Sequence, residues 1–334
     1  MIDDRKARVL EALVEEYIAT GEPVSSRAVL DRSGLSVSSA TVRNDLASLE
    51  SYGFVSQPHT SAGRVPTDTG YRYYVDHCSP ARLRAATRSR ISGFFSSVHS
   101  QLGRLLQETS GLLADLTHYP AVVLGPGLVG ESIRGIHLVP LGERVLLVVV
   151  VTNTGRVSQE LVQLPAVLAD SDLEKVEAIL DKAYCGHTFS ETGEVMDAIS
   201  ADRAAPSIRS AISEIVKNLQ RAEQSTREVY LGGTSQATSL WEDLAAVRRM
   251  LSLLEHEAVV MELIGAEEEG TTVRIGTELD AAEEGDLAVV ASSYDAGEHG
   301  SGRVGVLGPM RMDYRRTIKV VEEIGESLGD RLGG

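Results

Sequence analysis

Apolar side chains recur every three or four residues in three stretches within the first 53 residues, a spacing typical of amphipathic helices. A capping residue stands where each stretch should begin and a glycine where it should end: Asp3 or Asp4 with Gly21, Ser25 or Ser26 with Gly34, and Ser38 with Gly53. The sequence therefore predicts three short helices. Because only a few residues separate the second helix from the third, we expect a helix-turn-helix.

A hairpin is predicted directly after the third helix. Residues 54–57 suit a strand, residues 59–64 suit a polar loop that contains glycine, and residues 65–66 suit a short return strand. Thr67 or Asp68 then caps a further helix. A helix-turn-helix followed by such a hairpin predicts a winged helix-turn-helix DNA-binding domain over residues 1–80.

The rest of the chain alternates between helical and strand patterns. Residues 91–116 keep their apolar side chains on one face, which predicts one long amphipathic helix. Four strands are predicted next, at residues 121–124, 133–139, 145–152 and 157–164. Residues 165–228 return to helical spacing, and strands and helices resume after them.

These patterns predict an α+β multidomain fold. Residues 81–164 and 229–334 are expected to form one α/β domain with a long linking helix, which residues 165–228 interrupt as a mainly helical insertion. The apolar helical faces of the insertion have no obvious use inside that α/β domain. We therefore expect the insertion to mediate formation of a homodimer.

The formal net charge of −16 argues at first sight against DNA binding, because contacts with phosphate favour Lys and Arg. The charge is unevenly distributed, however: residues 1–90 contain 12 Lys and Arg against 11 Asp and Glu, so the remaining residues carry a net −17. Arg32, Arg43, Arg64 and Arg72 fall where a DNA-facing surface is expected. The absence of a hydrophobic leader and of any apolar run of membrane length predicts a cytoplasmic protein without membrane contact.

No catalytic or metal-binding constellation stands out in the sequence. The two cysteines are far apart, the eight histidines lack metal-ligand spacing, and no G-x-S-x-G motif occurs. Gly125, Gly127 and Gly130 match the dinucleotide-binding pattern, but too few residues follow for a crossover helix before the next strand. We therefore expect no catalytic residues, no cofactor and no metal.

The third helix carries the candidate base-reading residues. If Val42, Leu46 and Leu49 face the core, the opposite face is available to a major groove. Arg can contact guanine and Asn can contact adenine through two hydrogen bonds each, and hydroxyls near a helix N-terminus can bind phosphate. The candidates on this helix are Ser38, Ser39, Ala40, Thr41, Arg43 and Asn44. The alternative is an ordinary solvated helix face.

Several segments of the chain have a composition specific enough to suggest a family. They are GEPVSSRAVL from Gly21, LSVSSATVRNDLASLESYGFVSQPHTSAGRVPT from Leu35, GYRYYVD from Gly70, YLGGTSQ from Tyr230 and GVLGPMRMDYRRTI from Gly305. Together these segments resemble the HrcA family of bacterial heat-inducible transcription repressors. The resemblance extends over nearly the whole chain, whereas a shared helix-turn-helix alone would be weak support.

The resemblance implies a winged-helix domain, a GAF-like domain carrying an inserted dimerisation domain, and repression of chaperone operons at an inverted-repeat operator. It assigns His59, Thr60, Ser61 and Arg64 to the DNA-contacting wing. It also implies release of the operator on heating and restoration by a GroEL-type chaperonin. Two alternatives stay open, namely a metabolite-responsive winged-helix regulator with a ligand in the GAF-like domain, and an enzyme with an accessory DNA-binding module.

Overall fold

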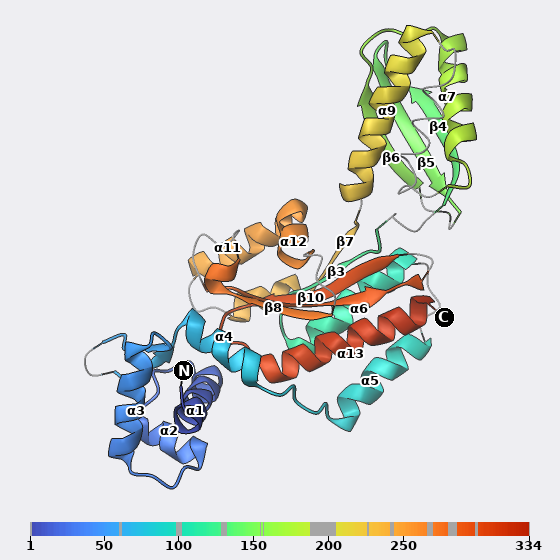
Figure 1. The fold of residues 1–334 in the computed structure, drawn as a ribbon. Helices are drawn as coiled ribbons and strands as arrows, with labels where there is room; N and C mark the ends of the chain where they lie inside the picture. The colour runs from blue at the N-terminus through green and yellow to red at the C-terminus, as the bar shows by residue number, and fades with distance from the viewer. Residues whose placement is uncertain are drawn as a thin grey trace. The chain divides into compact units, whose positions relative to one another are not determined.

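The computed structural model is a mixed α+β fold (Figure 1). It describes residues 2–59, 62–97, 102–127, 132–153, 155, 157–187, 205–225, 227–240, 244–265, 270–279, 286–297 and 300–333. The chain divides into two compact units. The first comprises Met1–Val123, Val229–Ser293 and Arg303–Ser327, and the second comprises Leu124–Glu228, Tyr294–Gly302 and Leu328–Gly334.

An N-terminal module of three helices, a hairpin and a fourth helix begins the first unit. Its elements are α1 (Asp4–Thr20), α2 (Ser26–Ser33), α3 (Ser39–Ser51), β1 (Val55–Ser56), β2 (Val65–Pro66) and α4 (Asp68–His77). Each of four side chains accepts a hydrogen bond from the backbone N–H three residues further on and so caps a helix: Asp3, Ser25, Ser38 and Thr67. Gly21 and Gly34 end the first two helices in the left-handed conformation. The predicted three helices and hairpin are thus confirmed.

The hairpin is joined to the start of α2 by a third short segment. The backbone of Val24 exchanges two hydrogen bonds with the backbone of Arg64, each 2.9 Å long. Gly63 lies so close to this segment that a Cβ atom at its position would be 2.4 Å from the carbonyl oxygen of Val24. Any larger residue at this position would push the hairpin away from the helices.

A core domain built on a five-stranded sheet follows the N-terminal module. Its strands are β3 (Ala121–Leu124), β7 (Val229–Gly232), β8 (Thr271–Ile275), β9 (Ala288–Asp295) and β10 (Ser301–Gly308), in the spatial order β7-β3-β10-β9-β8. Its helices are α5 (Ala85–Ser97), α6 (Leu102–Thr117), α10 (Ala237–Leu240), α11 (Leu244–Glu255), α12 (Glu257–Ile264) and α13 (Tyr314–Gly333).

Helices cover both faces of this sheet. A Cβ atom at Gly325 of α13 would contact Val304, whereas a Cβ atom at Gly305 would contact Ile264 of α12. Because neighbouring strand residues point to opposite faces, α13 and α12 lie on opposite sides of β10. This double cover explains why all of β10 except its first residue is buried.

The single long helix expected over residues 91–116 is wrong, because α5 and α6 are two separate helices (Figure 1). Each helix buries its own apolar side chains. Ile91 and Phe95 are buried on α5, whereas α6 buries Leu105, Leu106 and their neighbours and packs against β7. Helical periodicity continues across the two helices, so it did not indicate the break.

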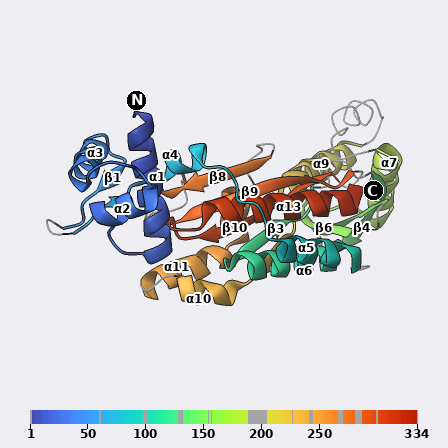
Figure 2. The same cartoon turned by 90° about the horizontal axis from the view of Figure 1, so that it is seen from below.

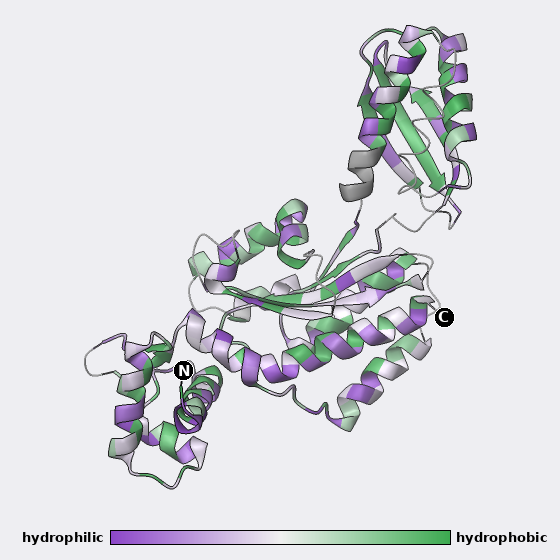
Figure 3. Ribbon diagram, viewed as in Figure 1, coloured by the Kyte–Doolittle hydropathy of each residue, from purple (hydrophilic) through white to green (hydrophobic). Residues whose placement is uncertain are grey.

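The second unit is formed mainly by an insertion between β3 and β7, here called the inserted unit. It contains the antiparallel sheet β4 (Ile133–Pro140), β5 (Val145–Thr152) and β6 (Val157–Gln163) with α7 (Asp170–Tyr184) and α9 (Pro206–Ser225). One continuous core joins the strands to both helices. Figure 3 shows β5 hydrophobic along its length.

Three expectations about the insertion are therefore wrong. The strands β4, β5 and β6 do not belong to the larger sheet, and the insertion begins before β4 and not at residue 165. The insertion is also mixed α/β and not mainly helical. The physical reason is that Ile208, Ile212 and Ile215 of α9 pack against strand residues such as Val148, so the strands and helices form one core.

Candidate nucleic-acid interface

Helix α3 presents a continuous exposed face. Val42, Leu46 and Leu49 are buried in the N-terminal module, whereas Arg43 and Asn44 are exposed. Ala40 and Ala47 are exposed on the same side. Figures 1 and 2 both show α3 on the side of the module that faces away from the core domain. The helix face expected from the sequence is thus exposed.

The hydroxyls at the start of α3 are engaged in local contacts. The Oγ of Ser38 accepts the N–H of Thr41 at 3.1 Å and lies 2.9 Å from the hydroxyl of Thr41. Ser39 is half-buried, with its Oγ 3.5 Å from the Oγ of Ser26 on α2. Ser38 and Thr41 therefore cap the N-terminus of α3, and Ser39 contacts α2.

The structure describes the hairpin except for residues 60 and 61. His59 is exposed, and its carbonyl oxygen accepts the N–H of Ala62 at 2.8 Å. Thr60 and Ser61, both expected in the DNA contact, lie outside the described residues. Arg64 forms an ion pair with Glu50 at the end of α3, with 2.8 Å between Nη2 and Oε2. Its side chain is 18% exposed, so it holds the hairpin against α3.

Three of the four arginines expected on a DNA surface have acidic partners within the protein. Arg32 pairs with Glu15 and Glu16, Arg64 pairs with Glu50, and Arg72 pairs with Asp76 and Glu278. Arg43 makes no ion pair with any residue that the structure describes. The pairs with Glu15, Glu16, Glu50 and Glu278 join residues that are far apart in the sequence, so no local pattern reveals them, whereas Arg72 and Asp76 are four residues apart on α4. Arg43 is thus the one of these four arginines whose side chain has no acidic partner among the described residues.

A partly buried ion pair that was not predicted from the sequence holds α1 against α3. Both oxygens of Asp45 accept hydrogen bonds from Arg5, at 2.8 and 2.9 Å. The carboxylate of Asp45 is 5% exposed, and this hydrogen bond raises the pKa of Arg5. The available signal was the position of Asp45 between Val42 and Leu49 on the apolar stripe, where a charge requires a partner.

Other chemical groups are sparse in the described part of the chain. No cluster of three or more His, Cys, Asp or Glu suited to a metal ion occurs among the described residues. Among them, no helix is both long enough and apolar enough to cross a membrane. Cys78 and Cys185 are free thiols.

Comparison with known proteins gives a consistent result. Residues 103–318 match the family model for the HrcA protein C-terminal domain. Heat-inducible transcription repressors HrcA from Frankia casuarinae and Halalkalibacterium halodurans are 38% and 35% identical to this chain, covering 100% and 98% of it and 99% and 97% of their own lengths. The repressor of the same name from Nocardia farcinica is 39% identical over 99% of this chain and 97% of its own length.

A solved structure has the same fold over its full length. The crystal structure of a hypothetical protein is 28% identical, has a TM-score of 0.63, and covers 100% of this chain and 99% of its own. The curated relatives are heat-inducible transcription repressors. The full-length identity to these repressors shows that the chain belongs to the HrcA family of heat-inducible transcription repressors.

Proposed function

We propose that the N-terminal module is a winged helix-turn-helix that places α3 in the major groove of an inverted-repeat operator upstream of chaperone genes. The exposed face of α3 is the observation that carries this proposal. Arg43 can donate two hydrogen bonds to guanine, and Asn44 can pair with adenine in the same way. His59 and the rest of the hairpin would contact the flanking backbone or minor groove.

A homodimer is required to read an inverted repeat, and the inserted unit offers a surface for it. Helices α7 and α9 cover one face of its sheet, whereas the other face is apolar and open. In this open face Leu147 of β5 lies between Val139 of β4 and Leu161 of β6, which are 43% and 65% exposed. Such a contiguous apolar face is unfavourable in water, and a second copy would bury it under twofold symmetry.

The helical faces first expected to form the dimer are used elsewhere. Ile208, Ile212 and Ile215 of α9 are at most 4% exposed inside the inserted unit. We therefore assign the dimer contact to the open face of β4-β5-β6 and keep the expectation that the insertion forms the dimer. The five-stranded sheet with helices on both faces suits the GAF-like domain that the family resemblance implies.

Release of DNA on heating follows from marginal stability. The chain outside residues 1–90 carries a net charge of −17, and this self-repulsion favours expansion. A loss of about 1 to 2 kcal/mol on heating greatly changes the folded fraction of a marginally stable protein. Unfolding would expose buried side chains such as Leu105 and Ile212, which a GroEL-type chaperonin could bind.

The proposal is tested by footprinting the purified protein on the promoters of the host's own chaperone operons at several temperatures. We expect protection of both halves of an inverted repeat, loss of protection on moderate heating, and recovery with chaperonin and ATP. Protection that is independent of sequence would refute operator recognition. Operator protection that persists on heating and does not change when chaperonin is added would refute the switching mechanism.

A ligand-responsive regulator is the second candidate, because one cavity favours it. The cavity has a volume of about 360 Å³ and lies between α1 and the core domain, lined among others by Tyr17, Tyr71, Asp286 and Arg311. Tyr71 is 2% exposed, and its hydroxyl has no hydrogen-bond partner among the described residues. The groups of both charges around the cavity would suit a small zwitterion. Under this candidate, dialysed protein would keep the operator on heating and release it only when the metabolite is added.

A further inference from the structure

The N-terminal module is fastened to the core domain by an arginine on α4. The Nε of Arg72 donates to Oε1 of Glu278 at 2.7 Å, its Nη2 also contacts Oε2, and Nη2 donates to the carbonyl oxygen of Val273 at 2.6 Å. The second oxygen of Glu278 accepts the N–H of Ile275 at 3.0 Å. This carboxylate is therefore held by its own backbone and meets the planar guanidinium through both oxygens.

A second contact lies one turn before Arg72 on α4. Asp68 Oδ2 accepts both the N–H and the hydroxyl of Thr277, each at 3.1 Å. Gly276 makes this approach possible, because its φ is +51° and a Cβ atom there would be 2.4 Å from Asp68 Oδ2. The turn of residues 276–278 thus fits the N-terminal half of α4.

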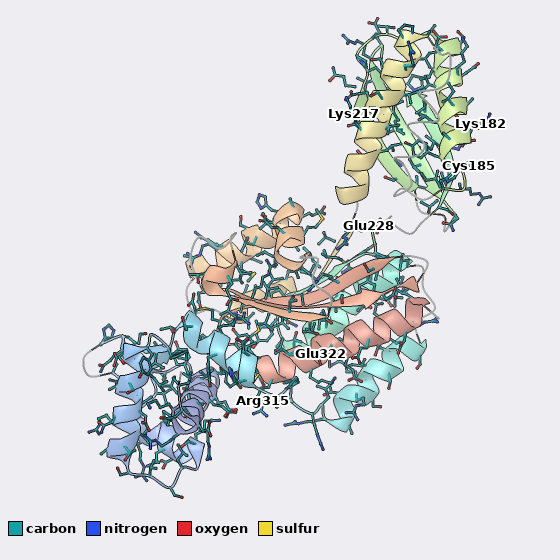
Figure 4. The ribbon with its side chains drawn as sticks, viewed as in Figure 1. Lys182, Cys185, Lys217, Glu228, Arg315 and Glu322 are labelled. Atoms are coloured by element: carbon teal, nitrogen blue, oxygen red, sulfur yellow. The ribbon has the colours of Figure 1, made fainter. Side chains whose placement is uncertain are left out.

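A second arginine, at the start of α13 in the core domain, contacts the N-terminal module. Nη1 of Arg315 donates to Oε1 of Glu15 on α1 at 3.1 Å, and Nε donates to the carbonyl oxygen of Ser79 at 3.0 Å. The carbonyl oxygen of Arg315 accepts the N–H of Ala81 at 2.8 Å. Arg315 lies at the start of α13, on the side of the N-terminal module (Figure 4). It fixes both α1 and the segment that leaves α4.

We propose that these contacts form a clamp that fixes the orientation of α3 relative to the core domain and so restricts the half-site spacings that a dimer accepts. The clamp comprises Asp68, Arg72, Thr277 and Glu278 at one point and Glu15 and Arg315 at the other. Two separated points of attachment prevent the module from rotating about either one. The recognition helix α3 belongs to the same packed module, so its direction relative to the core domain is fixed.

This inference rests on the proposed function, since spacing has meaning only for a dimer on an inverted repeat. Half-sites must lie about one or more helical turns of 10 to 10.5 base pairs apart for two recognition helices to enter the same face of DNA. A change in the number of intervening base pairs rotates one half-site around the duplex. A rigid joint cannot follow that rotation, whereas a loosened joint can, with weaker binding at the best spacing because orientation is no longer set in advance.

The test measures the affinity of the full-length protein for operators whose half-sites are moved by one or two base pairs in either direction. The variants are Glu278→Gln, Glu15→Gln and the two combined, which remove one charge at each point of the clamp. Arg104→Ala is the matched control, because it removes an ion pair of 2.8 Å with Glu108 that lies within α6. Thermal unfolding and affinity for a single half-site show whether each variant remains folded and able to bind DNA.

We expect the wild type and Arg104→Ala to lose about tenfold or more in affinity when the spacing changes by two base pairs. The combined variant should bind the best spacing several-fold more weakly, keep its single half-site affinity, and show a spacing penalty reduced to about threefold or less. Retention of the full penalty by a folded combined variant would overturn the clamp. A wild type that binds the inverted repeat no better than a single half-site would instead overturn the proposed dimeric function.

Discussion

Arg64 donates two hydrogen bonds to the same carboxylate oxygen of Glu50, from Nε at 3.1 Å and from Nη2 at 2.8 Å. Arg64 follows the hairpin loop, and Glu50 lies near the end of α3. The family resemblance assigns Arg64 to the DNA-contacting wing. The ion pair favours a different role, in which Arg64 positions the hairpin relative to the recognition helix.

The first prediction separates these two roles. If Arg64 positions the hairpin, Arg64→Ala and Glu50→Ala should weaken operator binding to a similar extent and leave the salt dependence of binding nearly unchanged, because the pair is already neutral. The measurement is the dissociation constant over a range of salt concentrations. If Arg64 contacts phosphate, Arg64→Ala should reduce the salt slope by about one and Glu50→Ala should strengthen binding.

The second prediction concerns base reading by α3. Arg43→Ala and Asn44→Ala should each reduce the discrimination between operator and scrambled DNA by about 1 to 3 kcal/mol, because each removes a two-pronged contact with a base edge. Binding to scrambled DNA should change little for Asn44→Ala. Competition binding with operator DNA and scrambled DNA gives the ratio of the two affinities. Arg27→Ala is the control, since Arg27 is an exposed arginine on α2 that pairs with Asp31. If all three variants discriminated between the two DNAs as well as the wild type does, α3 would be excluded as the base-reading element.

The third prediction concerns the dimer. Leu161→Asp should raise the dissociation constant of the dimer at least about a hundredfold, because burying an unpaired carboxylate costs roughly 3 kcal/mol or more. Sedimentation over a range of protein concentrations measures it. The control is Ala178→Asp, which adds the same charge at an exposed position of α7. Dimers that are equally stable in both variants would exclude the open face of β4-β5-β6.

The fourth prediction concerns alkaline pH. Burial raises the pKa of Tyr184 to about 12, above the usual tyrosine value of 10. The folded inserted unit therefore keeps this proton more tightly than the unfolded chain, so the stabilisation is complete below pH 10 and is lost as the pH rises toward 12. Two pKa units correspond to roughly 2 to 3 kcal/mol at most.

Tyr184→Phe tests this assignment, because the hydroxyl of Tyr184 has no hydrogen-bond partner among the described residues. The variant should be about as stable as the wild type at pH 7 and should lose less stability between pH 10 and pH 12. Urea unfolding at several pH values, followed by a probe in the inserted unit, measures the difference. An identical decline in both proteins would assign the alkaline sensitivity to other groups.

The sequence by itself determined the local structure of the N-terminal module. Ser25, Ser38 and Thr67 each cap a helix where the sequence predicts one, and Gly21 and Gly34 end the first two helices. These signals act over three or four residues, so they can be interpreted without knowing the fold. The exposed face of α3 was predictable for the same reason, since it lies opposite an apolar stripe on one helix.

Only the tertiary structure decided which distant groups meet. Arg72 and Glu278 are 206 residues apart, and no local pattern marks either as the partner of the other. The sequence predicts β4, β5 and β6 as strands, but a strand pattern cannot tell which sheet a strand joins. That choice depends on which helices cover the apolar face, and here α7 and α9, later in the chain, form a separate core with the strands. Long-range pairing depends on the packing of whole elements, which is why the sequence predicted α3 and its exposed face but neither the contacts of the clamp nor the boundary of the inserted unit.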